Sequence, residues 1–229
     1  MAKYYAISDV HGCLDVFTQA LSVIDWSEPD NRLFLLGDYL PHYDTCEESS
    51  AFFERCTTAL AAVKEVVDAH PGQVVALRGN HDDSMLDYID SGLWDISKEW
   101  MRFVKKMPLY HETPWQIFVH AGVEEDAGEE WKWATSDDWF VWKYPATTGR
   151  FIKDIVAGHV GVHELAQDYD YHQVYWDGES HYFLDGATEW SGEMPVLAFD
   201  TETQAYTTWL ATKDGAEFLG APKNALAVK

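Results

Sequence analysis

The amino-acid sequence predicts an α/β fold. Along the N-terminal part, short apolar runs alternate with longer segments whose apolar residues recur at helical spacing, a pattern typical of strands and helices interleaved in one sheet. The chain has 229 residues, of which 47% are hydrophobic, so it can bury a full core. No internal repeat or low-complexity linker marks a boundary, and we therefore expect one domain over residues 1–229.

The order of the predicted elements changes near the middle of the chain. The first part alternates strands and helices, and Pro71-Gly72 ends its second helix. After a third helical region the pattern becomes strands separated by turns such as Asp177-Gly178 and Asp185-Gly186. Residues 213–229 are small and polar, and we expect a loosely attached tail there. Strands are predicted at 3–8, 32–37, 73–79, 115–122, 154–159, 173–178, 181–186, 196–200 and 205–211, and helices at 13–24, 47–70 and 85–107.

The charge balance restricts the partners. With 16 Lys and Arg against 39 Asp and Glu, the formal net charge is −23, which argues against an extended surface for nucleic acid or anionic lipid. A small phosphorylated substrate remains compatible, because bound divalent metals reverse the potential inside one pocket. The three cysteines, Cys13, Cys46 and Cys56, form no C-x-x-C pair, and no stretch is apolar enough for a membrane span. We expect a cytoplasmic protein with no membrane partner.

Residues with metal-binding side chains follow the predicted strands. In an α/β sheet the C-terminal ends of neighbouring strands open onto one crevice, so such residues can converge there. Carboxylates and imidazoles are ligands for borderline divalent ions, and the lack of a thiolate set argues against a structural zinc site. Each of five glycines lies within two residues of a candidate, where the backbone must turn tightly. The candidates are Asp9, His11, Asp38, Asn80, His81, His120 and His159, and the glycines are Gly12, Gly37, Gly79, Gly122 and Gly158.

Around these positions the sequence resembles the calcineurin-like metallophosphoesterases, in particular the branch of serine/threonine phosphoprotein phosphatases and symmetrical diadenosine tetraphosphate hydrolases. The resemblance runs from Asp9 to about Asp200 and rests on ordered motifs, each weak alone and specific as a set. The motifs are Asp9-Val10-His11-Gly12, Gly37-Asp38-Tyr39-Leu40, Arg78-Gly79-Asn80-His81-Asp82, His120-Ala121-Gly122 and Gly158-His159.

The resemblance implies a four-layer α-β-β-α sandwich of two mixed sheets, with a two-metal site at the C-terminal ends of strands. Two divalent ions are implied, from among manganese, iron and zinc, with manganese favoured. They would generate a bridging hydroxide that attacks phosphorus in line. Asp38 would bridge the two metals. The implied ligands are Asp9, His11 and Asp38 for the first metal and Asp38, Asn80, His120 and His159 for the second.

Two further roles follow from the resemblance. His81, next to a ligand but not itself one, corresponds to the general acid that protonates the leaving oxygen. Arg78 corresponds to a catalytic arginine that binds substrate phosphate, for which its planar fork of donors is suited.

The sequence departs from the family pattern in the phosphate-binding positions. Pro41-His42-Tyr43 stands where the family has Asp-Arg-Gly, so the carboxylate that orients the catalytic histidine and a phosphate-binding arginine are both replaced. Asp44 and Asp82 are open candidates for the orienting carboxylate, and His42 for a weaker phosphate donor. The family's second arginine corresponds to Lys143, with Arg150 as the other candidate.

The function implied is hydrolysis of a phosphate ester or anhydride, most like a serine/threonine-type protein phosphatase, acting on a small phosphorylated substrate or a phosphopeptide. The alternatives are a dinucleoside polyphosphate hydrolase and a non-catalytic relative that binds a nucleotide or a protein. The aromatic-rich segment 131–144 lies between two ligand histidines. Its interpretation as packing of a small cap is favoured over a platform that stacks a nucleobase.

Overall fold

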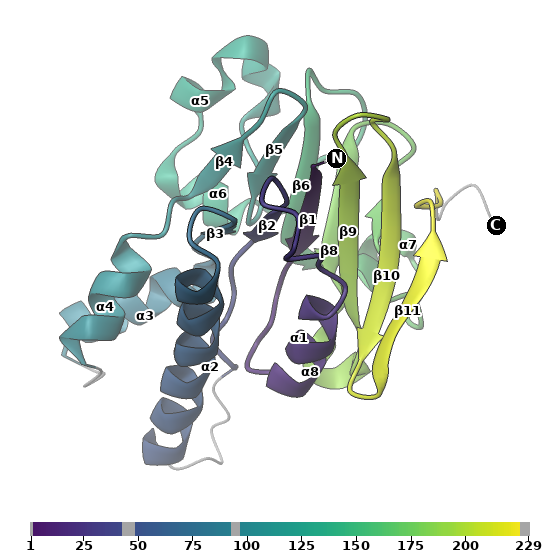
Figure 1. Ribbon diagram of the computed structural model, residues 1–229. Coiled ribbons are helices and arrows are strands. Elements are labelled where there is room, and N and C mark those ends of the chain that lie inside the picture. The colour runs from purple at the N-terminus through teal and green to yellow at the C-terminus, as the bar shows by residue number, and fades with distance from the viewer. Residues whose placement is uncertain (1, 43–48, 93–96, 225–229) are drawn as a thin grey trace.

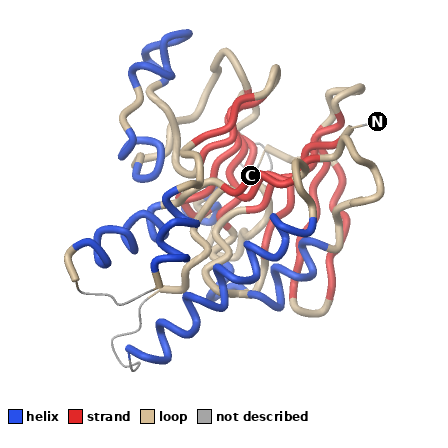
Figure 2. The backbone as a smooth tube through the Cα atoms, turned by 60° about the vertical axis from the view of Figure 1, so that its left-hand side comes forward, coloured by secondary structure: helices blue, strands red, loops and turns tan. Residues whose placement is uncertain are grey.

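Two mixed β-sheets form the centre of the molecule (Figures 1 and 2). The computed structural model of the chain describes residues 2–42, 49–92 and 97–224. One sheet contains β1 (Lys3–Ile7), β2 (Arg32–Leu35), β3 (Val74–Ala76), β9 (Met194–Asp200), β10 (Tyr206–Thr212) and β11 (Gly215–Gly220). The other contains β4 (Tyr110–Glu112), β5 (Gln116–Val119), β6 (Asp154–Gly161), β7 (Tyr175–Trp176) and β8 (His181–Asp185).

Each sheet has a parallel set of strands flanked by antiparallel ones. The six-stranded sheet has the order β11-β10-β9-β1-β2-β3, in which β1, β2 and β3 are parallel and β9 pairs antiparallel with β1. The five-stranded sheet has the order β4-β5-β6-β8-β7, with β5, β6 and β8 parallel. The C-terminal ends of β1 to β3 and of β5 and β6 therefore lead into the loops that carry the candidate ligands.

Helices cover the outer face of each sheet. Helices α1 to α4 pack on the six-stranded sheet through a core that includes Phe17, Leu60 and Met85. Helices α5 to α7 pack on the five-stranded sheet through Trp131 and Phe140. The predicted four-layer sandwich is confirmed. The helices are α1 (Leu14–Leu21), α2 (Ser49–Ala69), α3 (Asn80–Asp90), α4 (Lys98–Lys105), α5 (Trp131–Ala134), α6 (Asp137–Trp142), α7 (Val162–Ala166) and α8 (Thr188–Ser191), with a 3₁₀ helix η1 (Glu125–Glu130) before α5.

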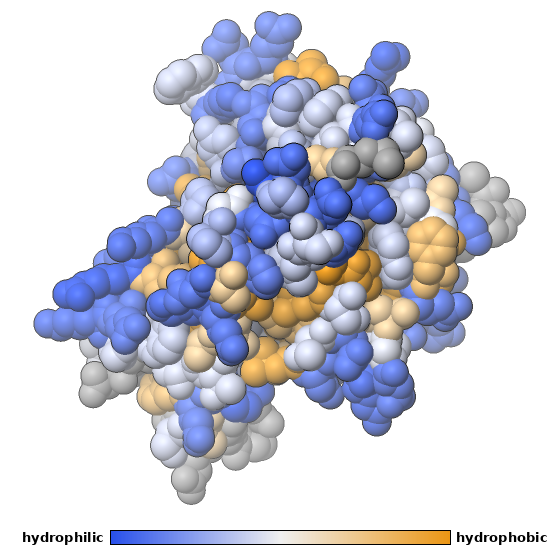
Figure 3. All heavy atoms as spheres, viewed as in Figure 1, coloured by the Kyte–Doolittle hydropathy of each residue, from blue (hydrophilic) through white to orange (hydrophobic). Residues whose placement is uncertain are grey.

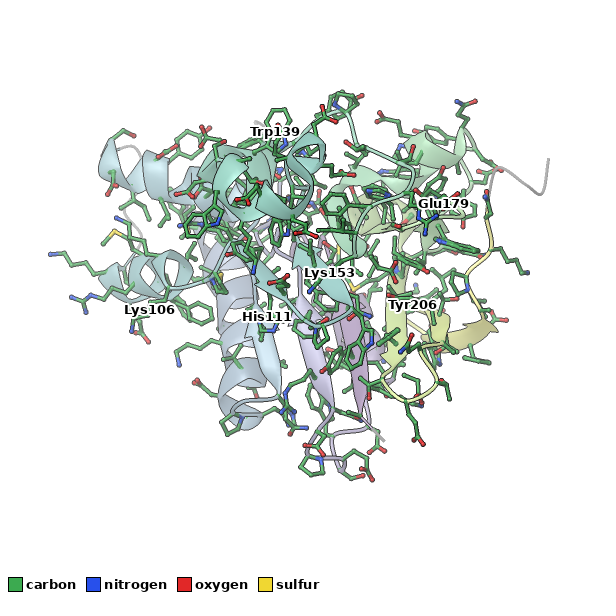
Figure 4. The ribbon with its side chains drawn as sticks, turned by 90° about the horizontal axis from the view of Figure 1, so that it is seen from above. Lys106, His111, Trp139, Lys153, Glu179 and Tyr206 are labelled. Carbon is green, nitrogen blue, oxygen red and sulfur yellow. The ribbon has the colours of Figure 1, made fainter. Side chains whose placement is uncertain are left out.

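Aromatic and aliphatic side chains fill the space between the two sheets. Phe34 of β2 stacks on Phe118 of β5 with ring centroids 3.8 Å apart and an interplanar angle of 11°. Tyr206 of β10, labelled in Figure 4, donates to Asp154 Oδ2 of β6 at 2.6 Å and so links the two sheets at the N-terminal ends of these strands. These contacts fix how the loops at the ends of the two sheets face each other.

The C-terminal part differs from the prediction. Residues 215–220 are not a loose tail but form β11, which pairs antiparallel with β10. The segment has few apolar residues, mainly Phe218 and Leu219, so its composition did not predict a strand. It forms one because the open edge of β10 supplies backbone hydrogen-bond partners. Asn224 also forms a bridge with Trp176.

The helical region predicted at 85–107 also has different bounds. It begins five residues earlier, at Asn80, because Gly79 caps α3 and Asp82 accepts its backbone N–H at 3.0 Å. Among the described residues, no helix has both the length and the apolar character needed to cross a membrane. Hydrophilic side chains cover most of the face seen in Figure 3, in keeping with the net charge of −23.

Replacing Phe34 by Ala should lower the free energy of unfolding by about 3–5 kcal/mol, because it removes a ring packed between the two sheets. Denaturant unfolding measures this change. As a control, Phe218→Ala on the edge strand β11, where the ring is 58% exposed, should cost under about 1 kcal/mol. Equal losses for the two variants would contradict the assignment of the inter-sheet core.

Candidate metal centre

The side chains predicted as metal ligands come together from both sheets. Asp9 and His11 follow β1, Asp38 follows β2 and Asn80 opens α3 after β3; from the second sheet, His120 follows β5 and His159 lies in β6. All except His159 are buried. Four of the six have a backbone in the left-handed region, which is costly for residues with a side chain and which clusters at functional sites. The φ angles are 52° at Asp9, 43° at His11, 55° at Asp38 and 64° at His159.

One group of donors consists of Asp9, His11 and Asp38. His11 Nε2 lies 3.8 Å from Asp9 Oδ1 and 3.7 Å from Asp38 Oδ2. His11 Nδ1 lies 3.0 Å from the carbonyl oxygen of Leu40, an arrangement in which Nδ1 carries the proton and donates it. Nε2 then presents a lone pair toward two carboxylates. Because lone pairs and anionic oxygens repel one another, this arrangement suits a shared cation.

A second group consists of Asn80, His120 and His159. Asn80 Oδ1 lies 2.8 Å from His120 Nε2 and 2.9 Å from His159 Nδ1. His120 Nδ1 faces the carbonyl oxygen of Leu36 at 3.0 Å, so its Nε2 also presents a lone pair to the site. Asp38 reaches this group as well, since its Oδ1 lies 3.5 Å from His120 Nε2. Asp38 therefore faces both groups, one through each oxygen, as a bridging ligand must.

Without bound cations, the surroundings of the site disfavour the charged forms of the ligand side chains. Burial raises the pKa of Asp9 and Asp38, and Asp185 and the mutual repulsion of the carboxylates raise them further. Burial also lowers the pKa of His11 and His120, which favours neutral imidazoles. Metal ligands bind as neutral imidazoles and ionised carboxylates, and bound cations would offset the burial and repulsion that disfavour the ionised carboxylates. The donor sets fit two divalent cations.

Two glycines are required by the carboxylates. A Cβ atom at Gly79 would collide with Asp38 Oδ1, and one at Gly158 would collide with Asp9 Oδ2 and with Ser8 Oγ. Gly79 and Gly158 therefore leave room for the oxygen atoms of the ligands, in addition to the conformational freedom expected of a glycine.

The donors open onto a cavity of about 310 Å³. This volume is at the lower end of the range for small-molecule sites. No lysine or arginine occurs among the described residues that line it, so binding of a phosphate there depends on the cations and on imidazoles. The lining residues are Asp9, His11, Asp38, His42, Asn80, His81, His159, Gly161, His163, Asp185, Ala187, Glu189 and Trp190.

His81 lies beside the donors and faces the cavity. Its Nε2 lies 3.9 Å from Asp38 Oδ2, and its backbone N–H donates to Asp38 Oδ1 at 2.9 Å. Burial, with His11 and His42 nearby, lowers the pKa of His81 to about 3. A phosphate dianion bound next to the imidazole acts in the opposite direction and favours its protonated form.

Neither carboxylate considered as an orienting partner for His81 is seen in that role. Asp82 is buried and accepts the backbone N–H groups of Asp38, Tyr39 and Gly79 at 2.8, 3.1 and 3.0 Å, so it holds the loops after β2 and β3 together. Asp44 lies outside the described residues.

At the position where the family has Asp-Arg, His42 pairs with Glu189, a contact that was not predicted from the sequence. The carboxylate of Glu189 accepts the backbone N–H of His42 at 3.1 Å and pairs with its Nδ1. The His42 ring stacks on His11 with centroids 4.3 Å apart and meets His81 edge to face at 4.4 Å. Glu189 and Asp185 both line the cavity. The one local signal in this region was the turn at Asp185-Gly186, because 147 residues separate Glu189 from His42 and no sequence pattern links them.

Of the basic residues predicted to bind substrate, His42 lines the cavity, whereas Arg78, Lys143 and Arg150 do not. Arg78 Nε lies 3.1 Å from Asp83 Oδ1, close enough for an ion pair but outside hydrogen-bond geometry. Arg150 is exposed. Lys143 is buried, and its Nζ donates to the carbonyl oxygen of Val123 at 2.7 Å. These placements do not support direct substrate binding by Lys143 or Arg150.

Lys143 belongs to a buried charge network behind the site. Its Nζ lies 2.8 Å from Glu125 Oε1, and Glu125 Oε2 lies 3.0 Å from His181 Nε2. His181 Nδ1 in turn lies 3.0 Å from Asp177 Oδ2. Although burial lowers it, the hydrogen bonds to Asp177 and Glu125 raise the pKa of His181 to about 9. The network joins η1 and α6 to β8.

The aromatic segment 131–144 divides into two sets. Trp131 and Phe140 are buried in the outer core, which agrees with the favoured packing interpretation. Trp142 meets the ring of His159 edge to face at 6.2 Å but does not line the cavity. Trp139, labelled in Figure 4, is 39% exposed on α6.

Comparison with known proteins now decides the family. The model of the family "Calcineurin-like phosphoesterase" matches residues 2–200, most of the chain. The chain belongs to the calcineurin-like phosphoesterase family. The motifs and the fold of this family are thus those that position the two groups of donors.

Two relatives illustrate the similarity within the family. Both are named "Bis(5'-nucleosyl)-tetraphosphatase, symmetrical": one from Acidovorax ebreus is 29% identical over 131 residues, and one from Methylobacillus flagellatus is 26% identical over 121 residues. Each match covers 52% of this chain and 43% of the relative, so the chain matches less than half the length of these relatives.

Solved structures share the fold at low identity. A candidate diadenosine tetraphosphatase has a TM-score of 0.63 at 13% identity, with 92% of this chain and 93% of that chain covered. A serine/threonine phosphatase from Saccharomyces cerevisiae has a TM-score of 0.58 at 13% identity, with 97% and 81% covered. At this identity the similarity shows the fold alone.

Asp38→Asn should be the most damaging single change for metal binding, because it weakens the one ligand that faces both donor groups. After loading with manganese, elemental analysis should give about two metals per chain for the wild type and under about one for the variant. Asp68→Asn on the exposed side of α2 is the matched control and should leave the metal content unchanged. A wild type that retains no metal would contradict the two-metal assignment.

His181→Gln should remove a pH-dependent contribution to stability. Because the folded pKa of about 9 lies above the ordinary value near 6.5, the contribution of His181 is fully present below about pH 6.5 and is lost as the pH rises through about 9. The difference in melting temperature between wild type and variant should therefore shrink over this range. A difference that stays constant from pH 6 to pH 10 would mean that His181 does not carry the charge in this network.

Proposed function

We propose that this chain is a metal-dependent phosphohydrolase that cleaves a phosphate ester or anhydride of a small substrate. The observation that carries the proposal is the pair of donor groups that share Asp38 and open onto the cavity. Two divalent cations bound there would supply Lewis acidity toward the phosphoryl oxygens and an activated water. Manganese is proposed first, because oxygen donors from Asp9, Asp38 and Asn80 accompany the three imidazoles.

The residues of the chain have separate tasks in this proposal. Asp38 and the other ligands hold the cations and fix the position of the phosphoryl group. His81 faces the cavity and gives a proton to the leaving oxygen. His42, held by Glu189, lies against His81 and His11 and supports their orientation. The complete donor set argues against a non-catalytic relative, since binding alone needs no such arrangement.

The substrate class is proposed as a nucleotide polyphosphate rather than a phosphoprotein. The relatives that match at 26% and 29% identity are named tetraphosphatases. The cavity of about 310 Å³ is at the lower end of the range for small-molecule sites, which suits a small substrate better than a long peptide. Hydrolysis of phosphoserine or phosphothreonine peptides, the type first expected from the sequence, remains the second candidate because of the fold shared with a serine/threonine phosphatase.

The cellular location is part of the same proposal. An odd number of cysteines without a C-x-x-C pair suits a reducing compartment, and we assign the protein to the cytoplasm on this basis. The negative net charge disfavours nucleic acid as a partner.

A turnover screen with manganese tests the proposed function. The substrates are an aryl phosphate, a phosphoserine peptide, diadenosine tetraphosphate and a cyclic nucleotide, with the Asp38→Asn variant as the negative control. Release of phosphate or nucleotide by the wild type, and its loss in the variant, is the expected result. A metal-loaded wild type that turns over none of these substrates would remove the hydrolase proposal.

His81→Ala should slow hydrolysis of substrates with poor leaving groups by about 100-fold to 10,000-fold, since these need a proton on the leaving oxygen. Aryl phosphates with good leaving groups should be affected far less. Steady-state kinetics on an alkyl and an aryl phosphate, with metal content checked for each sample, measure the difference. Equal losses on both substrates would remove His81 from the role of general acid.

A further inference from the structure

An aromatic pair borders the cavity at α8. Trp190 of α8 lines the cavity and is 51% exposed. Tyr169, in the loop after α7, is 72% exposed and stacks against Trp190 with ring centroids 5.0 Å apart and an interplanar angle of 29°. Two large aromatic side chains that remain this exposed beside a site are unusual for a surface whose only role is packing.

Two histidines hold the Trp190 ring from its sides. His163 meets it edge to face at 5.2 Å and 83°, and His172 does so at 4.7 Å and 82°. These contacts fix the plane of the indole, so the protein loses little conformational freedom when a ligand stacks on it. The aromatic pair is therefore a preorganised surface.

The same histidines retain unused hydrogen-bonding capacity. His172 is 8% exposed, and the Nδ1 atoms of His163 and His172 are buried without a hydrogen-bond partner among the described residues. Leaving a buried polar atom without a partner costs free energy, so such atoms usually have a reason at a binding site. His163 also lines the cavity.

The aromatic pair is continuous with the metal centre. The chain runs from Asp185 through Ala187 and Glu189 to Trp190, and all four residues line the cavity that five of the six candidate ligands also line. A substrate whose phosphate lies at the donor groups therefore has its organic part in reach of Trp190. The lining offers no lysine or arginine among the described residues and two carboxylates at this end, so this part of the substrate should carry no further negative charge.

We infer that Trp190 and Tyr169 form a stacking subsite for the nucleobase of a nucleotide whose phosphate lies at the metal centre. The inference rests on the proposed function for the reaction itself. A nucleobase has a π-face that stacks on aromatic rings and polar atoms at its edge for imidazole partners. The ring of a phosphotyrosine, which is esterified at its only oxygen, has no such edge and would leave the histidines unused.

Binding to the manganese-loaded protein tests the subsite. Isothermal titration with adenosine 5'-monophosphate and with ribose 5-phosphate compares two ligands that differ only by the base. The wild type should bind the nucleotide roughly tenfold to hundredfold more tightly, which is the range expected from stacking of one base. Trp190→Ala should bring the ratio of the two affinities close to one without weakening the binding of ribose 5-phosphate. Trp190→Phe should retain most of the preference for the nucleotide.

Control variants separate the subsite from other aromatic residues and from misfolding. Trp133→Ala changes an 85% exposed indole on α5 that does not line the cavity, and it should leave the ratio unchanged. Tyr169→Ala keeps Trp190 in place and should lower the ratio by a smaller factor, so it serves if Trp190→Ala does not fold. Loss of the ratio in Trp142→Ala but not in Trp190→Ala would overturn the assignment.

The outcomes also distinguish the subsite from the reaction. A wild-type protein with turnover in the substrate screen but equal affinity for the two ligands would overturn the subsite and leave the hydrolase. Tighter binding of phosphotyrosine than of the nucleotide would overturn it as well. A Trp190-dependent preference for the nucleotide without any turnover would support the subsite and remove the hydrolase.

Discussion

The buried carboxylate of Asp38 is the constraint on which the rest of the site depends. One oxygen faces His11 and the other faces His120, both through ring nitrogens that present lone pairs. In a buried position this arrangement is repulsive unless cations lie between the groups. Burial, followed by the charges of Asp9 and Asp82, raises the pKa of Asp38 in the protein alone. The backbone N–H of His81 donates to the carboxylate and holds it in place, and Gly79 leaves room for it.

The sandwich brings the two halves of the centre together. Asp9, His11, Asp38 and Asn80 come from the sheet of β1 to β3, whereas His120 and His159 come from the sheet of β5 and β6. Packing of the inner faces, with Phe34 stacked on Phe118, fixes the distance between these sets. The metal centre therefore depends on the core between the sheets, because the packing there determines whether the six candidate ligands come together.

The segment from Asp185 to Trp190 shapes one end of the cavity. Glu189 pairs with His42, and Trp190 extends the cavity toward Tyr169. The region where the family pattern has an Asp-Arg pair is therefore built from an imidazole and a distant carboxylate. Such a rim has less positive charge, so in the proposed function the binding of phosphate would depend more on the cations and on contacts to the organic part of the substrate.

The sequence by itself determined the α/β class, most strands and the ligand types, because period-two and helical patterns and residues at strand ends are local features. Its ordered motifs carried the family and the identity of the six candidate ligands. Only the tertiary structure decided that 215–220 pair with β10, that Lys143 turns inward to Glu125, and that Glu189 meets His42. Each of these depends on an open sheet edge or a contact between segments far apart in the chain, and no local pattern encodes such a contact.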